Sequence, residues 1–291
     1  MVATPGDIWL EDSRQLDRFW DYTRRHPTVV GGLTLLTVMV IVALGAPYVS
    51  SDPLALNPIN RLKPPSQQSW FGTDMFGREI YSRTLHGSRI SLTVGLSVAV
   101  LSTVIGLFIG LVSGYIRVVD AIVMRIMDGL MAIPAILLAI ALMALFGSSI
   151  ENVIVAISIP EVPRTARLVR SVVLTIREQP YVEAAISVGT SFPKILGRHI
   201  LPNTIAPLVV QATYVCASAV ILEAILSFLG AGTPPEIPSW GNIMAEGRSF
   251  FEIAPWIIFF PGIFLAVMVL AVNVLGDGLR DTLDPRIARQ M

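Results

Sequence analysis

The sequence predicts an all-α integral membrane protein, and two observations, its composition and its long apolar runs, predict this class. Of its 291 residues, 53% are hydrophobic and only 14% are charged, whereas about 25% of residues are charged in soluble domains. A helix needs about 20 apolar residues to cross roughly 30 Å of hydrocarbon. Five runs without a charged residue reach this length: Val29–Val49, Ile90–Ile116, Gly129–Ile150, Asn203–Leu222 and Ile253–Gly276.

The distribution of basic residues decides whether a sixth, weaker run also crosses the membrane. Asn152–Pro160 is short, and charged residues follow it from Glu161 onward. Cytoplasmic loops of membrane proteins collect Lys and Arg. With six spans and an internal N-terminus, fifteen of the 21 Lys and Arg residues lie inside; without the weak run, only seven do. The sequence therefore predicts six transmembrane helices with both termini cytoplasmic. The fourth helix begins near Glu151 and ends in arginines that reach the interface.

The N-terminal segment, DIWLEDSRQLDRFWDYTRRHP, is charged and is not typical of a signal peptide. Its apolar residues near one helical face favour an interfacial helix, with a solvated arm as the alternative; they are Trp9, Leu16, Phe19 and Trp20.

The formal net charge is zero, so nothing indicates a nucleic-acid partner. The single cysteine, Cys216, excludes an internal disulfide.

The motifs of a self-sufficient enzyme or pump are absent from the sequence. It has no Gly-x-x-x-x-Gly-Lys-Ser/Thr loop, no His-Glu-x-x-His pair and no Gly-x-Ser-x-Gly elbow. We therefore expect no catalysis by this chain alone, so uphill transport would draw on a partner or an ion gradient. A gradient-driven carrier buries ionisable groups near the membrane midplane. Asp128 and Glu223 are instead expected near helix edges or against a neighbouring helix, with a gate role as the alternative.

A polar segment, EAAISVGTSFPKILGRHILPN, separates the fourth and fifth spans and is predicted to form a cytoplasmic helical elbow. Pro180 suits a first helical turn, and Glu183 complements the dipole of a helix over Tyr181–Val188. Gly189 fits the C-terminal cap, where positive φ is required. Thr190 or Ser191 can cap a second helix.

The predicted second helix of this segment ends at Leu201-Pro202, before the fifth span, after passing through Ile195, Leu196 and Ile200. The first helix carries apolar residues that need a cover. They either pack against the helix ends of this chain or dock onto a cytoplasmic protein; they are Val182, Ala185, Ile186 and Val188.

Small residues recur every four positions along the second span, at Ser102, Gly106, Gly110 and Gly114. Such a stripe lets helices approach closely, either as core packing or as a sliding surface.

In the outer segment Ser50–Gly87, Asp74 can pair with Arg78 and order the chain. We expect this segment to contact a partner, with a passive lid as the alternative.

Four blocks, taken together, resemble one family. The segment beginning EAAISVG resembles the EAA loop of type I ABC importer permeases. RHILPN resembles the spelling of the dipeptide/oligopeptide branch, with His199 where the widespread form has isoleucine. WFGTDMFGREIYSR resembles that branch's FGTDxxGRDxxSR signature, with Glu79 for Asp. SFLGAGTPPEIPSWG and NVLGDGLRDTLDPR resemble its outer loop and C-terminal signature. The match runs from about Arg24 to Arg286 and fits the C-type subunit of the permease pair.

The resemblance departs at IPEVPR (Ile159–Arg164), where the family usually has aromatic residues and fewer prolines. Pro160, Glu161 and Pro163 imply a kink in the fourth span, because an interior proline removes a helical hydrogen bond.

The type I ABC importer permease fold follows from this resemblance. It implies a cytoplasmic arm at 1–28, a first transmembrane helix at 29–49, an extracytoplasmic segment at 50–89, a five-helix core at 90–280 with a coupling loop at 177–202, and a cytoplasmic tail at 281–291. The implied partners are a second homologous permease, two cytoplasmic ATP-binding subunits, an extracytoplasmic substrate-binding protein and a peptide, in a prokaryotic inner membrane. ATP and Mg would be held by partner subunits, and no cofactor or metal is expected in this chain.

The resemblance also implies site residues. ATPase coupling is assigned to Tyr181, Glu183, Ala184, Ala185, Gly189, Ile200, Leu201 and Pro202. An outer gate or partner contact is expected at Asp74, Arg78, Glu223 and Trp240. The rival interpretations are an ion-gradient-driven secondary transporter, the same ABC architecture importing nickel or glutathione, and a scaffold subunit without a pathway.

Overall fold

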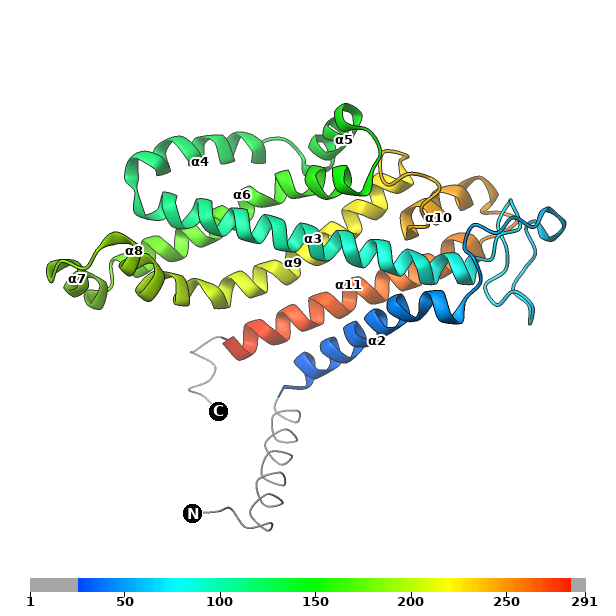
Figure 1. The fold of residues 1–291 in the computed structure, drawn as a ribbon, viewed down its shortest axis with the longest axis horizontal. Coiled ribbons are helices and arrows are strands. Elements are labelled where there is room, and N and C mark those ends of the chain that lie inside the picture. Colours follow the sequence, from blue (N-terminus) through cyan, green and yellow to red (C-terminus); the bar gives the residue numbers. More distant parts are fainter. Residues whose placement is uncertain (1–25, 284–291) are drawn as a thin grey trace, which may run out of the picture.

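The computed structural model describes residues 26–283, which fold as a bundle of long helices (Figure 1). The long helices are α2 (Pro27–Val49), α3 (Ile80–Tyr115), α6 (Ile150–Arg177), α9 (Leu201–Phe228) and α11 (Trp256–Leu283). Shorter helices join or cover them: α4 (Arg117–Met131), α5 (Ala135–Phe146), α7 (Pro180–Ser187), α8 (Phe192–Ile195) and α10 (Trp240–Gly247). The predicted all-α class is confirmed. The predicted interfacial helix containing Trp9 and Trp20 lies outside the described residues.

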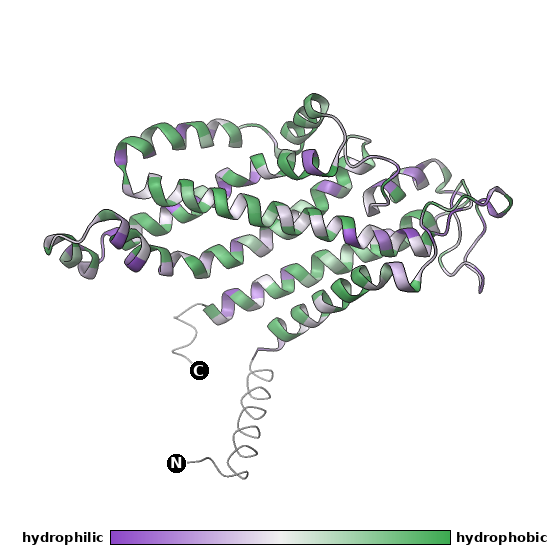
Figure 2. Cartoon of the chain, in the orientation of Figure 1, coloured by the Kyte–Doolittle hydropathy of each residue, from purple (hydrophilic) through white to green (hydrophobic). Residues whose placement is uncertain are grey.

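By length and composition, four helical stretches could cross a membrane: Pro27–Val49, Ile80–Tyr115, Phe192–Phe228 and Trp256–Leu283. The α4–α5 pair is apolar enough to be a fifth span, although its two helices are bent by 90°. Helix α6 is 28 residues long, but it does not reach the same apolar composition because of its charged second half. The hydropathy along the ribbon is drawn in Figure 2, where the long helices are mostly apolar.

Helix α6 begins at Ile150, close to the start predicted near Glu151. The Ser149 hydroxyl caps it by accepting a hydrogen bond from the Asn152 N–H at 3.1 Å. The helix continues without a break through Pro160 and Pro163. The weak run of the sequence is therefore part of one long helix.

The third predicted span, Gly129–Ile150, is wrong as a single straight helix. Helix α4 ends at Met131, and α5 begins only at Ala135. Pro134 stands directly before α5 and explains the break, since proline has no N–H and biases the preceding residue away from helical geometry. Helix α4 begins at Arg117, earlier than the uncharged run. Its acidic residues, Asp120 and Asp128, are accommodated there because they form ion pairs with arginines of α6.

The second predicted span began at Ile90, but helix α3 begins ten residues earlier, at Ile80, and has 36 residues. The predicted extracytoplasmic segment 50–89 therefore ends in helix. Its polar residues continue the helix because they are satisfied there: the Arg83 side chain is fully buried in ion pairs, and the Ser82 hydroxyl donates to the Ser51 carbonyl.

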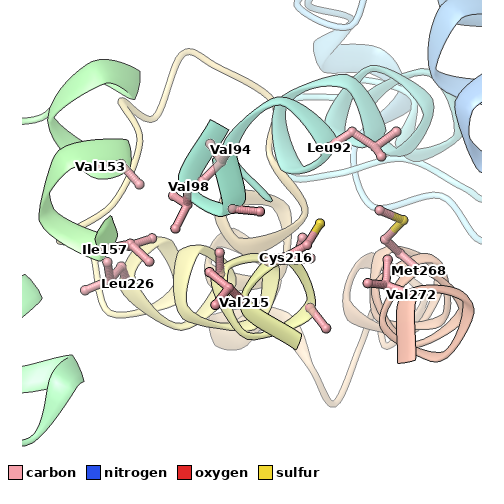
Figure 3. Packing of buried hydrophobic residues seen from close by; sticks show 14 of the residues in the cluster. Leu92, Val94, Val98, Val153, Ile157, Val215, Cys216, Leu226, Met268 and Val272 are labelled. Carbon is pink, nitrogen blue, oxygen red and sulfur yellow. The ribbon is translucent and has the colours of Figure 1, made fainter. Parts of the chain in front are cut away.

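The two ends of the bundle carry different structures. Helices α7 and α8 lie at one end, toward which the start of α2 and the end of α11 also point (Figure 1). The segment 50–79 and helix α10 lie at the opposite end. The main apolar core joins α2, α3, α5, α6, α9 and α11, and Figure 3 shows Val98, Ile157, Val215 and Met268 pointing into it.

The small-residue stripe of α3 packs against α6, as predicted for close helix approach. A Cβ at Gly106 would lie 2.6 Å from Thr165 Cβ, and one at Gly114 would lie 2.6 Å from Val173 Cβ. At Gly110 it would lie 2.6 Å from the backbone oxygen of Ala166. Because a backbone atom cannot move aside as a side chain can, α3 and α6 depend on this glycine for their contact.

Gly110→Ala is expected to lower the thermal stability of the purified protein. Overpacking costs about 1–3 kcal/mol, which exceeds the gain of about 1 kcal/mol for replacing glycine in a helix interior. Gly45→Ala is the matched control, since this α2 glycine has no atom within 4 Å of an added Cβ. Equal melting temperatures for the two variants would contradict the packing derived for α3 and α6.

Candidate functional site

The segment Pro180–Ile200 forms a compact elbow of two short helical pieces at one end of the bundle (Figure 1). Gly189 adopts φ 79°. Its N–H donates to the Ile186 carbonyl at 2.9 Å, and the Thr190 N–H donates to the Ala185 carbonyl at 3.0 Å. This pair of bonds is the Schellman arrangement that closes a helix. The predicted helix over Tyr181–Val188 and its glycine cap are therefore confirmed within one residue at each boundary, and the second helix begins after Ser191 as predicted.

The elbow (Pro180–Ile200) is fastened to the bundle by a small apolar cluster of its own. Val182 is fully buried, as is Ile200, and both belong to a cluster with Val169 and Val173 of α6 and Leu208 of α9. The aromatic rings of Tyr115 and Phe192 add a contact with 4.7 Å between their centroids. One side of α7 is thus covered by this chain.

The other side of α7 is open. Val188 is 82% exposed, and Tyr181 and Ile186 are each nearly half exposed. Ala184 is exposed and Ala185 half-buried. The exposed Glu183 carboxylate forms no ion pair or side-chain hydrogen bond with the rest of residues 26–283. Of the two covers considered for these apolar residues, packing within this chain therefore applies to Val182 but leaves Ile186 and Val188 uncovered.

The junction with α9 corrects one prediction. Leu201 and Pro202 do not end the second helix. A π-turn over Leu196–Ile200 carries the chain straight into α9, so that Phe192–Phe228 forms one 37-residue stretch. The Leu201 N–H donates to the Leu196 carbonyl, five residues back. The wider turn accommodates Pro202, which lacks an N–H and would crowd the carbonyl of an ordinary α-turn. The elbow is joined to α9 without a flexible break.

Basic residues of α6 fix its elbow-proximal half to neighbouring helices. The Arg170 guanidinium makes two hydrogen bonds to the Asp120 carboxylate of α4, one of them 2.6 Å long. Arg167 pairs with Asp128 at 2.6 Å. The Arg177 guanidinium donates to the carbonyl of Tyr115 at the end of α3, at 3.4 Å. The Arg167–Asp128 pair is exposed and contributes only about 0–1 kcal/mol. The half-buried Arg170–Asp120 pair therefore does more to hold α4 against α6.

At the opposite end, four buried or half-buried charges form an outer charge cluster (Asp74, Arg78, Arg83 and Glu246). Arg78 Nε lies 2.6 Å from Asp74 Oδ2, and Arg83 Nη1 lies 2.9 Å from the same oxygen. Arg83 Nη2 donates to Glu246 Oε1 at 3.0 Å, and Arg78 also pairs with Glu246. The predicted Asp74–Arg78 pair is confirmed, and it belongs to a network that ties the segment 50–79 to α3 and α10.

The residues predicted for an outer gate or partner contact are buried among residues 26–283. Asp74 is 1% exposed, and Trp240 and Glu223 are fully buried. The Trp240 indole N–H donates to the Thr84 carbonyl at 3.0 Å. The Glu223 carboxylate accepts hydrogen bonds from Ser227 at 2.8 Å and from Ser91 at 3.3 Å. Glu223 packs against α3, which was one of the two expected outcomes, and a gate role of these residues stays a prediction.

Sequence reasoning missed two groups. Arg83 and Glu246 complete the outer charge cluster, and the excess of arginine over Asp74 was the signal that a further carboxylate was needed. Glu161 of α6 is fully buried, and its Oε1 accepts hydrogen bonds from Arg164 at 3.2 Å and from Ser218 of α9 at 3.4 Å. The departing IPEVPR block thus contributes a polar link between α6 and α9.

Under the importer function that the sequence resemblance implies, Gly189→Ala is expected to lower substrate transport several-fold while leaving membrane insertion unchanged. An added Cβ would meet no atom within 4 Å, so the cost arises from the positive φ alone, about 1–2 kcal/mol for an L-residue. That strain would be relieved by tilting α7. Gly197→Ala is the matched control, because Gly197 is equally uncrowded and has no positive φ. Transport is measured in membrane vesicles, and equal rates for both variants would contradict the fixed bend.

Comparison with known proteins extends these observations. Residues 102–289 match the family model described as binding-protein-dependent transport system inner membrane component, and residues 14–65 match the N-terminal TM domain of oligopeptide transport permease C. A probable peptide ABC transporter permease protein of Sinorhizobium fredii is 57% identical over 267 residues, which cover 92% of either chain. A glutathione transport system permease protein of Pectobacterium atrosepticum is 42% identical over 275 residues, covering 92% of this chain and 90% of the relative.

A solved structure has the same fold. An inward-facing form of the MetNI methionine ABC transporter matches with a TM-score of 0.56 and 21% identity, over 69% of this chain and 96% of its own.

Proposed function

The chain belongs to the binding-protein-dependent transport system inner membrane components, and on this premise we propose that it forms half of the translocation pathway of an ATP-driven ABC importer for di- or oligopeptides. It is a multi-pass protein of a bacterial inner membrane. Peptide as the substrate is supported by the 57% identical relative, which is named for peptide transport, and by the match to an oligopeptide permease domain.

The observation that carries the coupling role is the open side of α7. An exposed apolar patch on a short helix outside the long bundle is unfavourable in water. Here it lies beside Glu183, whose carboxylate has no partner among residues 26–283. The elbow continues into α9 through the π-turn, so a force applied to α7 moves α9 with it. We assign α7 as the docking helix for a cytoplasmic ATP-binding subunit, with Glu183 as its polar anchor.

Six crossings with both termini in the cytoplasm complete the proposal. The crossings are α2, α3, the α4–α5 pair, α6, α9 and α11. Two observations support this topology. The elbow, the start of α2 and the end of α11 lie at one end of the bundle, away from the segment 50–79 (Figure 1). Basic residues are also in excess on the elbow side, as is typical of cytoplasmic segments.

The proposed assembly contains a second homologous permease, two cytoplasmic ATP-binding subunits and an extracytoplasmic substrate-binding protein. ATP and Mg are held by the ATP-binding subunits, and this chain is non-catalytic. The elbow and the bundle then move as rigid elements between two arrangements. Such a two-state element is what couples ATP binding at the partner subunit to a change in the bundle.

Uptake by the reconstituted assembly tests the function. The permease pair, the ATP-binding subunits and the binding protein are placed in liposomes and supplied with labelled dipeptides, longer peptides, glutathione or nickel. We expect peptide uptake that requires ATP and is not replaced by a proton or sodium gradient. Uptake by this chain alone under a gradient would support the secondary-transporter alternative. Uptake restricted to glutathione, as the name of the 42% identical relative suggests, or to nickel would change the substrate class.

A further inference from the structure

Helix α9 presents two chemically different faces in its elbow-proximal half. One face, with Val209, Ala212 and Cys216, lines a cavity of about 440 Å³ between α2, α3, α9 and α11. The side chains around that cavity are almost all apolar; the others along α3 and α11 include Leu96, Val100, Met268 and Leu275. This apolar face suits hydrocarbon or an apolar helix.

The other face of α9 carries polar side chains among apolar ones such as Ala206 and Val210, and this mixed face continues onto α11. Two cavities lie along it, of about 590 and 240 Å³, and they share Val210, Gln211 and Arg280 in their walls. We call the polar lining the inner polar wall; it comprises Asn203, Gln211 and Tyr214 of α9 and Asn273, Asp277 and Arg280 of α11. The two helices touch beneath it, since a Cβ at Gly276 would lie 2.3 Å from Thr213 Oγ1.

The polar groups of this wall are not used for folding. Apart from Asn203, whose side-chain amide donates to the His199 carbonyl at 2.7 Å, none of its side chains has a hydrogen-bond or ion-pair partner in the described part of the chain. Asp277 and Arg280 carry opposite charges three residues apart and are nevertheless not paired with each other. The side chains of Asn273, Asp277 and Arg280 are all exposed.

The depth of Gln211 makes the position of the wall informative. Gln211 is eight residues into the uncharged run that begins at Asn203, which is about 12 Å at 1.5 Å per residue, whereas Asn273 lies three residues before the end of the other uncharged run at Gly276. The wall therefore runs from the elbow-side boundary to more than a third of the depth of a hydrocarbon core roughly 30 Å thick. Polar side chains at such depth face protein or a water-filled cavity and not lipid tails.

We propose that the inner polar wall is this chain's contribution to the elbow-side half of the substrate route, and that the apolar face of α9 looks away from it. The proposal rests on the proposed function and specifies which residues line the path. The wall offers amide, phenol, carboxylate and guanidinium groups in one strip. These match a zwitterionic solute with backbone amides, because such a solute needs both donors and acceptors and both signs of charge along its path.

Thiol accessibility in the complete reconstituted transporter tests the assignment. Cys216 is the only cysteine, so Cys216→Ala gives a background in which a single thiol can be placed at Gln211 or Asn273. Val209→Cys and Leu275→Cys are the controls, because each lies two residues away on the same helix and lines the apolar cavity. A water-soluble, positively charged methanethiosulfonate is the probe, since it reacts with thiolate in water and not with a thiol in hydrocarbon.

We expect at least a tenfold faster reaction at the two wall positions than at the controls, in the nucleotide-free state, with slowing when a transported peptide and ATP are added. Equal rates at wall and control positions would overturn the assignment. A slow reaction at the wall in every nucleotide state, without protection by peptide, would also overturn it and would place a partner subunit on this face. ATP-dependent peptide uptake is measured on the same vesicles, so loss of the proposed function itself is recognised separately.

Discussion

Arg83→Ala is expected to destabilise the protein by about 3–5 kcal/mol, the cost of removing one partner from a buried ion pair. The Arg83 side chain is fully buried and bonds to both Asp74 and Glu246. Its loss would leave the Asp74 carboxylate, which is 1% exposed, with only Arg78 as a counter-charge. The outer segment 50–79 would then lose this ion-pair link to α3, although the Ser82–Ser51 hydrogen bond would remain. A lower melting temperature of the purified transporter and faster proteolysis within residues 50–79 are the measurements.

Arg89→Ala is the control for Arg83. It removes the same side chain six residues along α3, where the arginine is exposed and has no ion-pair partner within residues 26–283. We expect almost no change in melting temperature for it, whereas Arg83→Lys should lie between the two, because lysine restores the charge without the bidentate fork. Equal stability of Arg83→Ala and Arg89→Ala would contradict the role given to the outer charge cluster.

Glu183→Lys is expected to abolish ATP-driven uptake, with a loss of at least tenfold, while the protein still inserts and folds. The change costs the first turn of α7 only about 0.3–1 kcal/mol through the helix dipole, because the carboxylate has no other partner in the described structure. At a docking surface the same change reverses a charge, and like charges across an interface cost several kcal/mol. Uptake and ATP hydrolysis are both measured in reconstituted vesicles.

Glu151→Lys separates docking from helix effects. Glu151 is also an exposed first-turn glutamate, but it begins α6 at the end opposite the elbow. It should lose the same small dipole energy, together with its hydrogen bond to Ser149, and keep its transport. Normal uptake by Glu183→Lys, or equal losses in both variants, would contradict the assignment of α7 as the docking helix.

The elbow could be predicted from the sequence because every signal for it is local. Pro180 marks the start of α7, Gly189 has the positive φ that ends it, and Ser191 stands at the start of the next helix. The same holds for the α3 stripe, whose four-residue spacing fixes one helical face. In each case the residues that decide the structure lie within a few turns of one another, so propensity and periodicity suffice.

The features that the sequence did not predict depend on contacts or on competing local rules. Glu246 reaches Arg78 across 168 residues, and no pattern near either residue indicates the other. The break at Pro134 was hidden in an uncharged run that hydropathy favoured as one span. At Pro202 the opposite occurred: proline suggested an end, but the π-turn before it let the helix continue. Hydropathy and single-residue rules alone do not decide such cases.

Crosslinking from α7 tests the central claim most directly. A photoreactive amino acid replaces Val188, which is 82% exposed on the elbow, in the transporter in native membranes. A second variant carries it at Ile59, which is 88% exposed at the opposite end. The account predicts that Val188 captures the ATP-binding subunit and that Ile59 does not. Capture of the extracytoplasmic binding protein from Val188, or of the ATP-binding subunit from Ile59, would contradict it.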